Sequence, residues 1–416
     1  MVDWTKLPEE LLRMIAVRSF SAVELKRFCS ICKTWRSSVS TTDTPLSTNP
    51  LIKLKPLVIS VYTNGGLQQI NDLNLYAFLS RASFFRVTLS SSSTQGWLIK
   101  SDVDINLGTL HLLHPLSRLP LLHWCQSFDL FKFTLTEIRQ GFLVHYSRSN
   151  EAAFGFKKLV LAGKDRVFGI GFDGKIRYWN GEIWTRIKDQ IGEFVDIMVL
   201  KGLIYALDSQ GIVWWISSYS LSIFRYGTSL TNECGRDLSL VECCGELYIV
   251  DRLLEENVLK RKADSLDDDN AYVGVVPRIT NVIHDDVGNE KCKVVERECP
   301  KTVGFKVYKV DEELGKWVEV KSLGDSAVVV ATDTCFSVLA REYYGCVPNS
   351  IYFIDEKEVE VKVFKLDDGS IASMFGFERS CFQMFVPSFL CIKSANHLIR
   401  KSSLSSPFRV LNKRYN

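Results

Sequence analysis

The sequence predicts an α+β chain of two unequal domains, a small helical unit over residues 1–40 followed by an all-β region that fills most of the 416 residues. Helical spacing of apolar residues is confined to the N-terminal segment. Beyond it, short runs of β-branched and aromatic residues alternate with Gly, Asn and Asp turns. A third observation, a strand motif that recurs along the β region, predicts several similar sheets within it.

Composition and charge are those of an ordinary globular protein. Hydrophobic residues make up 46% and charged residues 24% of the chain, and the formal net charge is +3. So small a net charge gives no strong field toward nucleic acid or an anionic membrane surface, and we expect neither as a partner.

The most apolar stretch, "IMVLKGLIYAL" over residues 197–207, is interrupted by Lys201 and Gly202, so we expect no membrane-spanning helix. Twelve cysteines without a regular framework of spacings are typical of reduced thiols. We therefore expect the protein in the nucleus, the cytoplasm or both.

Residues 1–40 are expected to form three short helices. Pro8 suits a first helical turn, and Glu9 and Glu10 suit its positive end. Ser21 and Glu24 have the spacing of a capping box, which predicts a second helix start. Apolar residues continue from there at steps of three and four, and so few residues cannot bury all of this apolar surface internally. Part of it is expected to contact a partner.

The segment "LPEELLRMIAVRSFSAVELKRFCSICKTWRSSV" resembles an F-box in its Leu-Pro opening, its acidic pair and its "ICKTW" motif. This resemblance implies docking onto the Skp-type adaptor of a cullin-RING ubiquitin ligase. The adaptor-binding residues that it implies are Leu7, Pro8, Leu11, Leu12, Ile15, Leu25, Ile31 and Trp35.

Three other interpretations of this segment were weighed. Cys29 and Cys32 have C-x-x-C spacing, but no second thiol pair or preceding strand supports a zinc or redox site. The basic residues within 26–36 are typical of a solvated helix face rather than a nucleic-acid site. An internal helical cap on the C-terminal domain is the third alternative.

Residues 41–50 are rich in Ser, Thr and Pro and lack an apolar period, which predicts a linker. The β region therefore spans 51–416. Within it, "GLIYALD", "GELYIVD" and "NSIYFID" share a Tyr and a closing Asp, and "RVFGIGFD" is a looser copy. If this alignment holds, Tyr205, Tyr248 and Tyr352 occupy equivalent positions.

Residues 253–300 are expected to be a charged loop inserted into one repeat. They hold 18 charged residues among 48, a composition typical of a segment with little to bury. Without them the motif recurs about every 40 to 45 residues, which predicts a β-propeller of six or seven blades. The insertion would lie between the second and third strands of its blade, on the face that carries the connections between blades.

Taken together, the N-terminal segment, "GWLI", "LLHPLSRLPL" and the repeat order resemble plant F-box proteins with a kelch-like, F-box-associated propeller. The resemblance implies a substrate-recognition subunit of an SCF-type ubiquitin ligase. Its partners would be the Skp-type adaptor, through it a cullin, and a protein substrate. The alternative is a non-degradative propeller scaffold or inhibitor.

Catalytic, cofactor and metal sites are not expected. His111 and His114 would point to opposite faces of one strand, away from a common site with His123 and Cys125. No phosphate-binding loop motif occurs. The recurrent aspartates favour turn hydrogen bonds over paired-carboxylate catalysis; they are Asp173, Asp208, Asp251 and Asp355. We therefore expect a non-catalytic adaptor.

Overall fold

A computed structural model provides the structure of the chain, and all structural statements concern the residues that it describes. These are 7–18, 28–29, 31–38, 53–54, 59–63, 66–70, 77–90, 94–103, 110–121, 132–146, 156–162, 166–171, 173–179, 184–230, 237–255, 300–311, 316–355, 358, 360–374 and 379–387.

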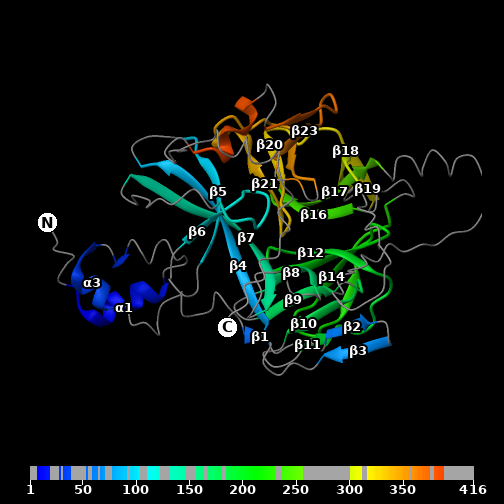
Figure 1. Ribbon diagram of the computed structural model, residues 1–416, viewed down its shortest axis with the longest axis horizontal. Coiled ribbons are helices and arrows are strands. Elements are labelled where there is room, and N and C mark those ends of the chain that lie inside the picture. The colour runs from blue at the N-terminus through cyan, green and yellow to red at the C-terminus, as the bar shows by residue number, and fades with distance from the viewer. Residues whose placement is uncertain are drawn as a thin grey trace, which may run out of the picture.

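Two helices are described in the N-terminal unit, α1 (Glu9–Arg18) and α3 (Lys33–Ser37), and they lie to one side of the sheets (Figure 1). Helix α1 begins at the predicted place, where the N–H of Leu12 donates to the carbonyl of Pro8. Leu12, Phe28 and Trp35 form a small buried core between the helices. The predicted helix start at Ser21 lies outside the described residues, so the number of helices remains a prediction.

The β region begins with a nine-stranded sheet that consists of two four-stranded groups and the short strand β1 (Lys53–Leu54). The groups join only through the pairing of Phe142 with Leu159. We call them blades 1 and 2. Blade 1 contains, from one end, β7 (Phe133–Tyr146), β4 (Ala77–Leu89), β5 (Trp97–Val103) and β6 (Leu110–Leu113). Blade 2 contains β8 (Phe156–Ala162), β9 (Arg166–Gly171), β10 (Ile176–Trp179) and β11 (Trp184–Arg186).

Three further sheets form blades 3 to 5. Blade 3 contains β12 (Phe194–Leu200), β13 (Leu203–Asp208), β14 (Val213–Ile216) and β15 (Ile223–Arg225). Blade 4 contains β16 (Asp237–Cys243), β17 (Glu246–Leu254), β18 (Thr302–Asp311) and β19 (Lys316–Val320). Blade 5 contains β21 (Cys335–Leu339), β20 (Ser326–Val330), β22 (Ser350–Phe353), β23 (Lys362–Lys365) and β24 (Ile371–Ser373). A hairpin of β2 (Ile59–Thr63) and β3 (Gly66–Ile70) is separate.

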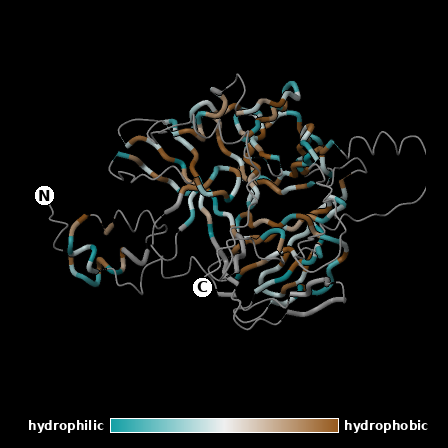
Figure 2. The backbone as a smooth tube through the Cα atoms, viewed as in Figure 1, coloured by the Kyte–Doolittle hydropathy of each residue, from teal (hydrophilic) through white to brown (hydrophobic). Residues whose placement is uncertain are grey.

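The blades are arranged around a common centre, as Figure 1 shows. The innermost strands of successive blades contact one another around this centre, in the order β7, β8, β12, β16 and β21. Separate hydrophobic clusters fill the spaces between blades 2 and 3, 3 and 4, and 4 and 5. A fourth cluster packs Phe84 and Leu98 of blade 1 against blade 5 and closes the ring. The architecture is a β-propeller, and the hydrophobic stretches follow its strands (Figure 2).

The described residues form five blades, where chain length predicted six or seven. Dividing the length by one repeat period assumes uniform blades, and these blades are not uniform. Strands β4 and β7 are 13 and 14 residues long, and blade 5 uses five strands. Length therefore overestimates the number of blades that the described residues form.

The repeat tyrosines share an orientation but not a strand position, because Tyr205 and Tyr248 lie on the second strand of their blades whereas Tyr352 lies on β22, the third strand of blade 5. Tyr205 lies in the cluster between blades 3 and 4, Tyr248 packs against the one between blades 4 and 5, and Tyr352 lies in the one between blades 5 and 1. Each therefore faces the next blade around the ring. Tyr248 is only half-buried, whereas the other two are buried.

The closing aspartates have three different settings. Asp173 and Asp208 accept hydrogen bonds from backbone N–H groups two residues on, as predicted for turns. Asp251 lies within strand β17 instead, because that strand continues to Leu254, so the turn prediction is wrong there. Asp355 follows β22 and binds the side chains of Arg252 in the neighbouring blade 4 and of Lys362 in its own blade 5.

The charged insertion leaves blade 4 between its second and third strands, as predicted. The N–H of Glu255 donates to the carbonyl of Lys301 at 2.9 Å, so the two ends of the insertion lie side by side. Residues 256–299 lie outside the described residues. Because Asp237, the first residue of β16, pairs with Arg252, the insertion leaves from the end of the propeller where β8, β12 and β16 begin. We call this end the insertion face.

None of the described helices has the length and apolar character needed to cross a lipid bilayer.

Candidate functional site

The predicted adaptor-binding residues separate into a surface and a core. Leu11, Ile15 and Ile31 are 41%, 44% and 52% exposed, Pro8 is exposed, and Leu7 is half-buried. Met14, which is not among the residues that the F-box resemblance implies, is also exposed. Its spacing of three residues from Leu11 was the signal that could have identified it. We call Leu11, Met14, Ile15 and Ile31 the helical apolar surface.

Leu12 and Trp35 are not part of this surface, so direct contact of these two residues with the adaptor stays a prediction. Both are buried, and the ring of Trp35 lies 4.5 Å from that of Phe28, centroid to centroid. The periodicity placed Leu11 and Leu12 on one face, but only one of two adjacent residues can point into so small a core. Leu25, the one remaining residue of the predicted set, lies outside the described residues.

The C-x-x-C pair contributes packing to the same core. Cys29 and Cys32 are half-buried against it. Burial raises the pKa of the Cys29 thiol, and the nearby Arg36 only partly offsets this. The side chain of Arg36 donates to the carbonyl oxygen of Cys29 at 3.1 Å. A thiol with a raised pKa is a poor nucleophile and metal ligand.

The propeller presents a cleft of about 740 Å³ at the insertion face, a volume in the range of ligand-binding clefts. All five blades contribute to this insertion-face cleft, beginning with Ser117 and Leu119 after β6. Its lining is rich in charge, and the charged residues are Lys157, Lys158, Asp196, Asp237, Arg252, Asp333, Asp355 and Glu358.

Asp196 connects three blades at the floor of the cleft. It forms an ion pair with Lys158 of blade 2 and accepts a hydrogen bond from the N–H of Leu240 of blade 4 at 2.6 Å. The N–H of Ile197 donates to its other oxygen at 2.7 Å. Since both of its carboxylate oxygens are engaged, Asp196 has a structural role: it links blades 2, 3 and 4 at the cleft.

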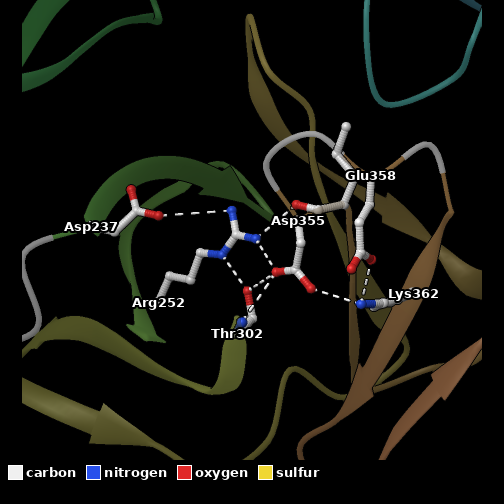
Figure 3. Close-up of polar contacts among 7 residues, drawn as sticks. Asp237, Arg252, Thr302, Asp355, Glu358 and Lys362 are labelled. Atoms are coloured by element: carbon white, nitrogen blue, oxygen red, sulfur yellow. Dashed lines mark hydrogen bonds and ion pairs between the residues drawn. The ribbon is translucent and has the colours of Figure 1, made fainter. Parts of the chain in front are cut away.

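Asp355 occupies the same role between blades 4 and 5 (Figure 3). Arg252 donates to its Oδ1 at 2.8 Å and Lys362 donates to its Oδ2 at 2.7 Å. Thr302, just after the insertion, adds a hydrogen bond from its hydroxyl. Burial alone would raise the pKa of Asp355, but the hydrogen bonds from Lys362 and Thr302 outweigh it and hold that pKa below its usual value. Arg252 and Thr302 flank the insertion, so this cluster fixes both of its ends to blade 5.

Asp333 joins blade 5 to blade 1. It lies in the turn between β20 and β21, and both Lys100 Nζ and Arg118 Nε donate to it at 2.7 Å. Arg118 also donates to the carbonyl of Gly141 on β7 at 2.8 Å. The Lys100 side chain is fully buried, and this burial lowers its pKa to about 8 although Asp333 opposes the shift. The ring is thus closed by a buried ion cluster as well as by apolar packing.

The possible catalytic groups have other roles in the described part of the chain. His114 is buried and its Nδ1 accepts from the N–H of Leu116 in a turn. The side chain of His111, and residues 123 and 125, lie outside what is described. Among the described residues, no three His, Cys, Asp or Glu side chains are grouped closely enough to hold a metal ion.

Comparison with known proteins matches both parts of this arrangement. A family model described as the KIB1-4 beta-propeller matches residues 69–367. F-box protein At2g17690 of Arabidopsis thaliana is 52% identical over 94% of this chain and 100% of its own length. Putative F-box protein At1g65770 of the same plant is 49% identical with the same coverage.

A more distant relative is also an F-box protein. F-box protein SKIP23 of Arabidopsis thaliana is 27% identical over 85% of this chain and 84% of its own. Among solved structures, a glutaminyl cyclase of Myxococcus xanthus covers 45% of this chain and 82% of its own with 14% identity. Its TM-score of 0.20 is too low to support an inference.

Proposed function

This chain belongs to the plant F-box proteins that carry a KIB1-4 β-propeller, and on that premise we propose that it is a substrate-recognition subunit of an SCF-type ubiquitin ligase. Residues 1–40 would dock onto the Skp-type adaptor and through it a cullin, residues 41–50 would be the linker, and the propeller over 51–416 would bind the protein substrate. The protein would act by proximity and orientation rather than by breaking bonds. It would work in the nucleus, the cytoplasm or both.

The observation that carries this proposal is the helical apolar surface. Four large apolar side chains are exposed on a helical unit that already has its own buried core. Leu11, Met14 and Ile15 have the spacing of one face of α1, and exposed apolar side chains on one helix face are typical of protein-interaction sites. In a chain whose relatives are F-box proteins, the Skp-type adaptor is the partner that this surface fits.

The insertion-face cleft is the proposed substrate site. It is the larger of the two main cavities of the propeller and lies where all five blades contribute. The charged insertion starts beside it, because Arg252 lines the cleft and lies three residues before the last described residue of that side. A rim that combines both signs of charge favours specificity in protein recognition.

Direct binding of the full chain to a purified Skp-type adaptor tests the docking step. Replacing Leu11 and Ile15 together by Glu places two charges on the helical apolar surface without touching its core. Interface hot spots cost about 2 kcal/mol or more each, so we expect the dissociation constant to rise about 100-fold or more. Leu203→Glu, at an exposed apolar position of the propeller, is the matched control and should bind normally. Normal binding by the folded double variant would reject the docking proposal.

A second pair of variants separates substrate binding from docking. Leu119→Glu with Lys157→Glu changes two exposed residues of the cleft. We expect unchanged adaptor binding but loss of the proteins that cross-link to the propeller in cells. Retention of the same cross-linked proteins would exclude the cleft as the substrate site.

A further inference from the structure

A second cavity of about 680 Å³ lies between three adjacent inner strands and adjoins the insertion-face cleft, with which it shares Lys158, Asp333 and Thr334. Strand β7 of blade 1, β8 of blade 2 and β12 of blade 3 form its walls, and the turn that carries Asp333 lies at one end. Its volume is within the range of small-molecule sites. We call it the channel cavity.

A bulge in β7 shapes one wall of the channel cavity. On the neighbouring strand β4, Phe84 pairs with Arg139 and Phe85 pairs with Glu137, which leaves Ile138 as an extra residue. Ile138 packs against the cluster that closes the ring, and Arg139 lines the channel cavity. Bulges of this kind re-aim a side chain and are common beside binding sites.

The charged side chains that surround Arg139 have hydrogen-bond or ion-pair partners among the described residues, whereas the guanidinium of Arg139 has none. Within the described part of the chain, Lys158 pairs with Asp196, and Asp333 is held by two cations. The carboxylate of Glu137 accepts from Ser83 and Gln140. No described residue forms a hydrogen bond or ion pair with the half-buried guanidinium of Arg139.

The cavity wall therefore has unused donors and few unused acceptors. A guanidinium presents five N–H groups in a planar fork that fits phosphate and carboxylate oxygens. On the β8 wall, Lys158 gives one hydrogen to Asp196 and has two more to offer. The carboxylates of Asp196 and Asp333 are already satisfied.

We propose that the channel cavity is a binding site for a small anion that bears phosphate or carboxylate oxygens, with Arg139 as its main ligand and Lys158 as a second donor. The occupant is a small molecule, because the site lies inside the ring of inner strands rather than on its rim. This assignment goes beyond the adaptor function and does not depend on it.

Isothermal titration of the full chain with inorganic phosphate, with citrate and with uncharged glycerol tests the assignment. We expect saturable binding of at least one of the two anions and none of glycerol. Arg139→Gln should weaken that binding by about tenfold or more, because a charge-assisted hydrogen bond is lost. Arg139→Lys, which keeps the charge but not the fork, should lie in between. Arg341→Gln removes an exposed arginine on blade 5 and should bind as the unaltered chain does.

A second variant does not depend on how Arg139 affects folding. Thr136→Glu adds a negative charge at an exposed position that lines the same cavity, and it should also weaken anion binding about tenfold. Equal binding by folded Arg139→Gln and the unaltered chain would overturn the assignment. So would the absence of binding by both phosphate and citrate, or equal binding of glycerol.

Discussion

Replacing Asp333 by Asn removes the counter-ion of a fully buried lysine, and we expect this change to lower the free energy of unfolding by about 3 to 5 kcal/mol at pH near 7. Lys100 has no exposed side-chain surface, and Asp333 holds it and Arg118 at 2.7 Å each. The asparagine keeps the size but not the charge. The loss comes mainly from the uncompensated charge of Lys100.

The pH dependence identifies Lys100 as the source. In the folded chain it releases its proton near pH 8, but in the unfolded chain only near pH 10. Between these values the unfolded state binds more protons, so the free energy of unfolding from this group rises with pH. Without Asp333 the folded pKa falls further. The deficit of the variant relative to the unaltered chain should therefore shrink between about pH 7 and about pH 9.

Urea denaturation of the full chain, monitored by tryptophan fluorescence at about pH 7 and about pH 9, measures the free energy of unfolding of the variant and of the unaltered chain. Asp325→Asn is the control, because the ion pair of Asp325 with Arg341 is about 70% exposed on both sides and should cost less than about 1 kcal/mol. Adding Lys100→Met to Asp333→Asn should recover part of the loss, since the fully buried charge of Lys100 is then absent and only the partly exposed Arg118 lacks its counter-ion. A loss below about 1 kcal/mol at pH near 7, independent of pH, would refute the reasoning.

Three further changes test other parts of the fold. Tyr352→Phe removes the hydrogen bonds that the hydroxyl makes with Cys381 and Val347 and should cost about 1 to 3 kcal/mol in the same assay; no loss would mean that these groups find other partners. Gly141→Ala should lower the melting temperature, because an added Cβ would lie 2.6 Å from Asp333 Oδ2; an unchanged melt would show that the Asp333 turn moves freely. Replacing residues 256–299 by a short Gly/Ser linker should shift melting by only a few degrees, since Glu255 and Lys301 are already hydrogen-bonded; aggregation or a far lower melt would place a blade strand inside the insertion.

Repeats and turns were predictable because their signals are local. Each repeat places a tyrosine three residues before its closing aspartate, and the recurrence of this motif predicted the shared orientation that Tyr205, Tyr248 and Tyr352 show. The insertion was visible as a change in charge density. Blade number was not predictable, because period and length cannot reveal that β7 lies inside β4 in blade 1 although it follows β6 in the chain.

The ion clusters were not predictable, because their members are far apart in sequence. Lys100 and Asp333 are separated by 233 residues, and Arg252 and Asp355 by 103. Lys100 within an apolar strand was the one local sign that a buried partner exists. Helical periodicity likewise identified an apolar stripe but could not decide that Leu12 points inward while Leu11 and Ile15 are exposed.

Quantitative co-purification of the full chain from plant cells treated with a proteasome inhibitor is the most direct test of the adaptor proposal. The unaltered chain should bring down the Skp-type adaptor, a cullin and propeller-bound proteins. Leu11→Glu with Ile15→Glu should lose the adaptor and the cullin together while the propeller-bound proteins remain. Recovery of adaptor and cullin at the same level with this folded double variant, or absence of both from the unaltered chain, would contradict the account.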